Sequence, residues 1–173
     1  MSNYKLMLKQ IKGFVFDVDG VFTDGQVYLV SGHKFVRSVN IKDGFAVQHA
    51  VKMGFHVAII TGGNSREVRK RFEYLGVKDI YMHSAVKLND YENFRKKYHL
   101  EDENILFMGD DLPDYEIMCR AGLPTCPADA AHEIQEVSKY ISNKKGGEGC
   151  ARDVIEQVLR IHDKWLVSGS FQW

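Results

Sequence analysis

Two aspartates one residue apart, Asp17 and Asp19, are the side chains with the clearest chemical potential in this sequence. They follow the apolar residues 13–16 and come directly before Gly20. Side chains at positions i and i+2 of a strand point to the same side, so a strand that continues through Asp17 would aim both carboxylates together. Two negative charges so close are costly unless a cation or a proton lies between them. The pair therefore predicts a metal site or an acid–base pair, and the alternative is a solvent-exposed turn.

Polar residues also follow three further predicted strands, at or near the point where each strand ends. Because the carboxyl ends of parallel strands form the ligand-binding edge of an open sheet, we expect these residues to meet the two aspartates there. Taken singly, each has an ordinary alternative, namely a helix cap, an exposed lysine or a turn. In chain order the residues are Thr61, Lys87 (just beyond its strand), Asp110 and Asp111.

Together these residue types suit phosphoryl transfer. Asp17 would attack the phosphorus and form an aspartyl-phosphate. Asp19 would protonate the leaving alkoxide and then deprotonate the attacking water, helped by its carboxylate neighbour to hold a proton near neutral pH. Asp17 and Asp110 would hold Mg²⁺, a hard cation that prefers oxygen ligands. Thr61, the backbone N–H groups after it and the charge of Lys87 would bind the phosphoryl oxygens.

The elements that must position these residues alternate between strands and helices. Directly after the two aspartates, two β-rich segments around a Ser-Gly turn predict a β-hairpin at about residues 25–39. The alternation predicts a Rossmann-like α/β fold, a doubly wound parallel sheet with right-handed crossovers, in one domain spanning 1–173. The predicted strands are 13–18, 56–60, 79–82, 105–108, 123–126 and 140–142. The predicted helices are 1–11, 43–53 (with Asp43 as N-cap), 65–75, 88–98, one that starts at Pro113, 130–137 and 151–166.

Composition restricts the class of protein. The 173 residues contain 23 Lys+Arg and 23 Asp+Glu, so the net charge is zero. This balance argues against nucleic acid and against an anionic membrane as partners. No stretch reaches the roughly 20 apolar residues of a membrane span. Three cysteines without metal-ligand spacing predict reduced thiols and a cytoplasmic location; they are Cys119, Cys126 and Cys150.

The order and spacing of the motifs resemble the haloacid dehalogenase superfamily of phosphatases over nearly the whole chain. The matching residues are Asp17-x-Asp19-Gly20-x-x-Thr23-Asp24, Thr61, Lys87 and Gly109-Asp110-Asp111-x-x-Asp114. The resemblance implies a nucleophile at Asp17, an acid–base group at Asp19 that also binds Mg²⁺ through its main-chain oxygen, and a third metal ligand at Asp110. It also implies phosphate binding by Thr61, Gly62 and Lys87, and supporting roles for Asp111 and Asp114.

More narrowly, the chain resembles the capless phosphatases of 3-deoxy-D-manno-octulosonate (KDO) 8-phosphate, a sugar-acid phosphate of lipopolysaccharide synthesis. The residues that carry this resemblance are 40–44, 59–63, Arg71, 109–114, 146–149 and Arg152. The substrate contacts it implies are Asn40, Ile41, Lys42, Asp43, Gly44, Gln48, Gly63 and Arg71. Several relatives have arginine in place of Gln48 and Gly63. Relatives that act on nine-carbon sialic-type acids tend to have glutamate in place of Gly63, so its absence favours the eight-carbon substrate.

The predicted elements contain no cap domain, so the active site of a monomer would be open to water. Capless relatives form tetramers in which the hairpin and a neighbouring surface complete each site. We therefore expect a homotetramer with shared active sites, with the hairpin between subunits, because a lone two-stranded ribbon is marginal in water. Arg71 is predicted to bind a substrate carboxylate across such an interface, or else to belong to a solvated helix face. The tail at about 167–173, with Phe171 and Trp173, is predicted to be frayed or weakly docked, and the alternative is that these aromatic residues cover a site, including that of a neighbouring subunit.

Other functions fit parts of the pattern. One alternative is a phosphatase for the 9-phosphate of a nine-carbon sialic-type acid. Another is a non-catalytic regulatory module that keeps the fold, and a third is a receiver-like domain that only accepts a phosphoryl group. A receiver has no use for the proton carrier Asp19, and a regulatory module has no need of every catalytic position. The filled positions therefore favour an enzyme.

Overall fold

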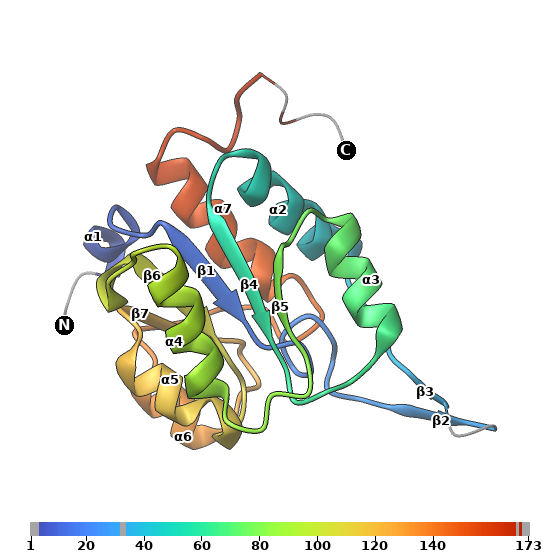
Figure 1. The fold of residues 1–173 in the computed structure, drawn as a ribbon. Coiled ribbons are helices and arrows are strands. Elements are labelled where there is room, and N and C mark those ends of the chain that lie inside the picture. The colour runs from blue at the N-terminus through green and yellow to red at the C-terminus, as the bar shows by residue number, and fades with distance from the viewer. Residues whose placement is uncertain (1–3, 32–33, 169, 171–173) are drawn as a thin grey trace.

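The computed structural model describes residues 4–31, 34–168 and 170. Its centre is a six-stranded sheet with the order β5-β4-β1-β6-β7-β8, and every neighbouring pair is parallel (Figure 1). The strands are β1 (Gly13–Phe16), β4 (His56–Ile60), β5 (Asp79–Tyr81), β6 (Ile105–Met108), β7 (Leu123–Cys126) and β8 (Tyr140–Ile141). The predicted doubly wound α/β class is confirmed.

The central strands are apolar throughout because both of their faces are covered. In β1, Phe14 and Phe16 point into one hydrophobic core and Val15 into the other. All three side chains are fully buried. The sheet is therefore sandwiched between two helical layers, and its chemistry is restricted to its ends.

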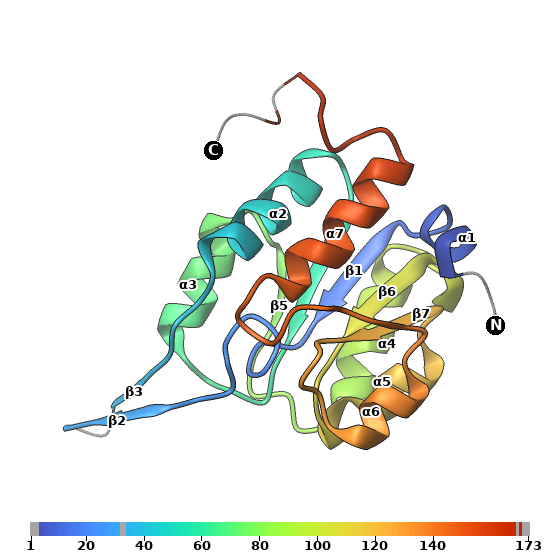
Figure 2. The ribbon, with the colours of Figure 1, turned by 180° about the vertical axis from the view of Figure 1, so that it is seen from behind.

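One helical layer contains α1, α2, α3 and α7, and the other contains α4, α5 and α6 (Figures 1 and 2). The helices are α1 (Tyr4–Leu8), α2 (Ile41–Lys52), α3 (Arg66–Tyr74), α4 (Lys87–Lys97), α5 (Tyr115–Arg120), α6 (His132–Val137) and α7 (Cys150–Ile161). Two short 3₁₀ helices, η1 (Asp102–Asn104) and η2 (Leu112–Asp114), precede β6 and α5. None of the helices in the described residues combines the length and the hydropathy needed to cross a membrane.

Several predicted helix boundaries are wrong. The first helix ends at Leu8 and not at residue 11, and the helix predicted from residue 130 begins at His132. The N-cap of α2 is Asn40, whose side chain accepts from the N–H of Lys42, whereas Asp43 lies buried in the first turn. The last helix ends at Ile161, five residues before the predicted end at 166. There the backbone of Asp163 enters the left-handed region at φ 54°, which stops an α-helix.

The β-hairpin follows β1 as predicted. Strands β2 (Tyr28–Val30) and β3 (Lys34–Val36) pair antiparallel and project away from the body of the protein (Figures 1 and 2). Its apolar side chains are exposed, with Leu29 at 78% and Phe35 at 61%. The residues of the turn, 32–33, lie outside the described residues, as do Phe171 and Trp173 of the tail.

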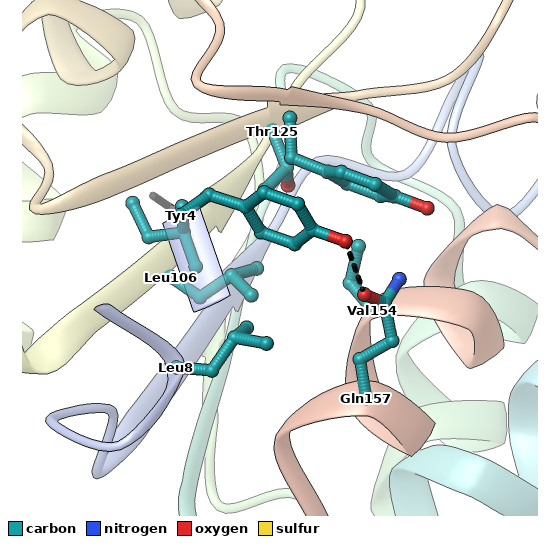
Figure 3. Close-up of a pocket in the computed structure, with 8 residues that line it drawn as sticks. Tyr4, Leu8, Leu106, Thr125, Val154 and Gln157 are labelled. Atoms are coloured by element: carbon teal, nitrogen blue, oxygen red, sulfur yellow. Dashed lines mark hydrogen bonds between the residues drawn. The ribbon is translucent and has the colours of Figure 1, made fainter. Parts of the chain in front are cut away.

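A small cavity lies where α1 packs against β7 and α7 (Figure 3). The hydroxyl of Tyr4 donates to Oε1 of Gln157 on α7 at 3.1 Å. The Tyr4 ring also stacks on Tyr140 with 4.9 Å between centroids. None of the residues that line this cavity is a predicted site residue, and the contacts of Tyr4 around it hold α1 against β8 and α7.

Candidate active site

The carboxyl ends of the parallel strands lie at one edge of the sheet (Figure 1), and predicted site residues directly follow β1 and β4 there. Asp17 directly follows β1, and its N–H donates to the carbonyl of Met108 on β6 at 3.0 Å. Thr61 directly follows β4, and its N–H donates to the carbonyl of Tyr81 on β5 at 3.0 Å. The parallel pairing thus extends one residue past the strands. It holds the buried Asp17 and Thr61 side chains at their shared edge.

Lys87 lies between two buried carboxylates. It is the first residue of α4, and its Nζ donates to Oδ1 of Asp17 at 2.7 Å and to Oδ1 of Asp114 at 2.8 Å. Burial opposes the charge on Lys87, but the two aspartates raise its pKa above the ordinary value. Lys87 is therefore a buried cation at neutral pH, and its alternative as an ordinary exposed lysine is wrong.

Asp110 completes a cluster of three acidic side chains. One carboxylate oxygen each from Asp17, Asp110 and Asp114 lies within 4.8 Å of the others. The N–H of Asp110 donates to Oδ2 of Asp114 at 3.1 Å. Gly20, at φ +88°, leaves the space for this arrangement, because a Cβ there would overlap the Asp110 carboxylate. These closely spaced oxygen donors suit a hard cation such as Mg²⁺.

The charges of the cluster also fit a cation. Burial raises the pKa of Asp17 to about 7, and Asp114 adds to the rise while Lys87 opposes it. Burial, Asp17 and Asp114 raise the pKa of Asp110 to about 8. When all three carboxylates are ionised, the single positive charge of Lys87 does not balance their three negative charges. A divalent ion among them would lower both pKa values and keep the carboxylates ionised.

Asp19 does not share the surroundings of Asp17. The strand geometry expected for the pair is wrong, because β1 ends at Phe16 and the chain turns after it. The Asp19 carboxylate accepts from Nε of Arg37 at 2.6 Å and from Nη2 at 3.1 Å. The carboxylates beside Asp17 are those of Asp110 and Asp114 instead. Asp17 therefore pairs with Lys87 and Asp19 pairs with Arg37, so the two carboxylates have different electrostatic surroundings.

The loop after β4 begins with Thr61 and leads into α3. The hydroxyl of Thr61 accepts from the N–H of Gly63 at 3.1 Å, and Ser65 is the N-cap of α3. Thr61 therefore does not cap α3, so the helix-cap alternative for this residue is wrong. Gly62 is exposed in this loop. Asp111, also exposed, caps η2 by accepting from the N–H of Leu112 at 2.8 Å.

Two predicted substrate contacts are engaged inside the protein. The side chain of Asn40 caps α2 and also donates to the carbonyl of Gly147 at 3.1 Å. Asp43 is fully buried and accepts from the N–H of Arg152 at 2.7 Å. The N-cap of α7, Gly149, has no side chain, so Asp43 supplies the cap from a neighbouring helix.

The other predicted substrate contacts are spread over α2, α3 and the loop after β4. Arg71 lies over Gly44, where a Cβ would come within 2.5 Å of Nη2. Gln48 is half-buried, and its Oε1 accepts no hydrogen bond from the described residues. Gly63 lies beside Asp19 in a small cavity. The remaining two, Ile41 and Lys42, are exposed. The substrate roles of all of them stay predictions.

A glycine-rich segment, residues 144–149, packs against the loop that carries Asp19. The N–H of Gly147 donates to the carbonyl of Val21 at 2.9 Å. The N–H of Gly146 donates to Oδ1 of Asp129 at 2.9 Å, and a Cβ on Gly146 would overlap the carbonyl of Gly20. This close backbone contact accounts for Gly146, and it helps to fix the loop that carries Asp19.

Gly146→Ala should therefore destabilise the protein by about 1–3 kcal/mol, because the added Cβ forces two backbones apart. Gly62→Ala is the matched control, since the nearest atom to its added Cβ is 3.9 Å away. That variant should stay within about 0.5 kcal/mol of the parent. Urea unfolding of both variants measures the difference, and equal stabilities would contradict the packing role of Gly146.

Sequence reasoning missed Arg37 as a residue of the site. Its position near the end of the hairpin gave no periodicity or motif that ties it to Asp19. The ion pair forms because the chain returns after the hairpin to the loop that carries Asp19, 18 residues further along the sequence. The available clue was that the segment between the hairpin and α2 must pass the carboxyl edge of the sheet and contains an arginine.

Comparisons with known proteins identify the family of this chain. The haloacid dehalogenase-like hydrolase family matches residues 76–153. The chain is 31% identical over 156 residues to the KDO 8-phosphate phosphatase of Salmonella typhi, which covers 90% of this chain and 83% of that protein.

Solved structures of similar proteins superpose closely. The KDO 8-phosphate phosphatase of Moraxella catarrhalis, in complex with magnesium, phosphate and KDO, has a TM-score of 0.92 at 32% identity, with 99% of each chain covered. The cobalt-bound enzyme of Haemophilus influenzae has a TM-score of 0.89 at 25% identity, covering 95% of this chain and 98% of that one. The chain therefore belongs to the KDO 8-phosphate phosphatase family of haloacid dehalogenase-like hydrolases.

Proposed function

We propose that this protein hydrolyses the phosphate monoester of KDO 8-phosphate, giving KDO and inorganic phosphate, with Mg²⁺ as cofactor. The observation that carries the proposal is the buried Asp17–Lys87–Asp114 arrangement with Asp110 beside it. The same family includes a relative with magnesium, phosphate and KDO bound. A nine-carbon substrate and a purely regulatory role are not favoured by these relatives.

In this mechanism Asp17 attacks the phosphorus, the bond to the sugar oxygen breaks, and an aspartyl-phosphate forms. Mg²⁺ bound by Asp17, Asp110 and the main chain of Asp19 would screen the carboxylates from the incoming phosphate and stabilise the charge of the transition state. Lys87 keeps the Asp17 carboxylate oriented and supplies positive charge next to the transferring group. Thr61 and the N–H groups of the following loop, from Gly62 onward, bind the phosphoryl oxygens.

Asp19 carries the proton in both halves of the reaction. It donates to the leaving sugar oxygen, and it then accepts a proton from the water that attacks the aspartyl-phosphate. Its separation from Asp17 supports this division of labour, because the nucleophile and the proton carrier have different partners. Asp114 and Asp111 support the site by orienting Lys87 and by capping η2.

The substrate assignment is tested by comparing kcat/KM for KDO 8-phosphate with that for the 9-phosphate of a nine-carbon sialic-type acid. We expect the eight-carbon substrate to be preferred by at least about tenfold, since one extra carbon unit in a fitted site costs roughly 1–3 kcal/mol. Removal of Mg²⁺ with EDTA should abolish both activities, and readdition should restore them. Equal values or a nine-carbon preference would overturn the assignment.

We also infer a homotetramer in which the hairpin packs against neighbouring subunits. The exposed apolar side chains of the hairpin support this inference, because an isolated two-stranded ribbon is marginally stable in water. Leu29→Lys should convert the tetramer to smaller species, as measured by native mass. Leu6→Lys on α1 is the control, since Leu6 is also exposed (63%) but lies outside the hairpin. A wild-type monomer would contradict the inference.

Two broader features belong to the same proposal. One sheet with a core on each face supports a single domain over residues 1–173, to which the hairpin and the tail are attached. The three cysteines, Cys119, Cys126 and Cys150, are free thiols, which supports a cytoplasmic location.

A further inference from the structure

Asp19 is the predicted proton carrier of the site. Among the described residues at the end of the hairpin, only Arg37 has a side chain that contacts it. Its guanidinium forms a two-point ion pair with Asp19, with distances of 2.6 Å from Nε to Oδ1 and 3.1 Å from Nη2 to Oδ2. The Arg37 side chain is 19% exposed and the Asp19 side chain 37%. This pair lies at the mouth of the site and not in the core.

The ion pair occupies both oxygens of the Asp19 carboxylate. Oδ1 also accepts a weaker bond from the hydroxyl of Thr23 at 3.4 Å. In the proposed reaction one of these oxygens must face the leaving-group oxygen of the substrate within hydrogen-bond distance. When Asp19 holds the proton that it donates, one of its oxygens is an O–H donor and the carboxyl group has lost the charge that pairs with the guanidinium. The arrangement in the structure is therefore a resting one, and a productive complex requires Arg37 to give up at least one of the two bonds.

The surroundings of Arg37 indicate what draws it away. A small cavity is bordered by Arg37, Asp19, Thr61 and Gly63, so the guanidinium faces the place where a substrate would lie next to the phosphate-binding loop. An arginine fork binds a carboxylate through two parallel hydrogen bonds and is selective for that geometry. A carboxylate on the substrate can therefore replace the Asp19 carboxylate on Arg37 with no loss of hydrogen bonds.

We propose that Arg37 selects phosphate monoesters whose alcohol part carries a carboxylate. The substrate carboxylate takes the place of Asp19 on the guanidinium, and Asp19 is released to face the leaving-group oxygen. The inference rests on the proposed phosphatase function and adds to it a residue of the same subunit that recognises the acid group. A sugar phosphate without a carboxylate leaves Arg37 on Asp19 and is hydrolysed slowly.

The test compares two alkyl phosphates that both need a proton donor, KDO 8-phosphate and a neutral hexose 6-phosphate. In Arg37→Met, kcat/KM for KDO 8-phosphate should fall, whereas kcat for the neutral ester should hold or rise because Asp19 is no longer held. The ratio of the two kcat/KM values should fall by about tenfold or more, the effect of losing a charge-assisted bidentate contact. Arg37→Lys should give an intermediate ratio, since an ammonium keeps the charge but not the fork.

The matched control is Arg160→Met on α7, which removes an exposed arginine paired with Glu156. It should leave the ratio unchanged. If Arg37→Met lowers both activities equally, Arg37 only orients Asp19 or supports the fold, and the selectivity proposal is wrong. If wild-type protein hydrolyses neither ester, the proposed function fails instead, which is a different result.

A direct measurement avoids reliance on the variants. In wild-type protein the NMR signal of the Arg37 Nε–H reports its short bond to Asp19. Addition of KDO, which has the carboxylate but no phosphate, should shift this signal, and addition of mannose should not. An unchanged signal at saturating KDO would overturn the exchange of partners.

Discussion

Asp17→Asn should reduce the hydrolysis of KDO 8-phosphate by at least about 10⁴-fold, the scale expected when a covalent nucleophile is lost. An amide oxygen is a poor nucleophile towards phosphorus, and the substitution also removes one oxygen of the metal-binding cluster. The variant should still fold, because Lys87 keeps its bond to Asp114. Phosphate release under saturating Mg²⁺ measures the effect.

The matched control for this variant is Asp163→Asn. Asp163 is exposed after α7 and has a left-handed backbone, which asparagine tolerates. Its activity should equal that of the parent protein. A metal-free Asp17→Asn protein should be at least as stable as the parent at pH 8, because Asp17 is held with a pKa of about 7. Retention of more than about one per cent of the activity would exclude Asp17 as nucleophile.

The stability of the metal-free protein should fall as the pH rises from about 4 to about 8. Burial raises the pKa values of Asp17 to about 7 and of Asp110 to about 8 from 3.8. The folded protein thus binds more protons than the unfolded chain in this window, so each rise in pH favours unfolding. Below pH 4 both states are protonated, and above pH 8 both are ionised, so the curve flattens at each end. The loss should exceed about 4 kcal/mol, because the rise in the pKa of Asp17 from 3.8 to about 7 is alone worth that much at about 1.4 kcal/mol for each pKa unit.

Mg²⁺ should offset part of this loss, since an ion that binds only the folded protein at 100 times its Kd adds about 2.7 kcal/mol. Urea unfolding at pH 5.5 and pH 8.5, in EDTA and in Mg²⁺, gives the four values needed. Asp110→Asn should flatten both the pH dependence and the response to Mg²⁺, whereas Asp163→Asn should change neither. A metal-free protein that gains stability towards pH 8 would contradict the account of the cluster.

The sheet was predictable because its strands carry strong local signals. The strands β4, β6 and β7 have the predicted bounds, since short apolar runs between turn residues specify buried parallel strands. The carboxyl-edge rule then places Asp17 and Thr61 together, and the hydrogen bonds from their N–H groups to neighbouring strands agree. Local pattern and topology were sufficient for this part of the site.

The pairings inside the site could not be read from local pattern, because they depend on contacts between distant segments. Arg37 and Asp19 meet only because the chain returns to the edge of the sheet directly after β3. Asp43 has the residue type of an N-cap, but it caps α7, 109 residues away, and not its own helix. In each case an acidic side chain finds a long-range partner that outweighs its nearest local option.

The central claim is that Asp17 carries the phosphoryl group. Rapid quench of the wild-type protein with ³²P-labelled KDO 8-phosphate and Mg²⁺ tests it most directly. We predict a burst of protein-bound label that is sensitive to hydroxylamine, is located on the peptide containing Asp17, and is missing in Asp17→Asn. Steady release of phosphate without bound label, or label on a different residue, would contradict the claim.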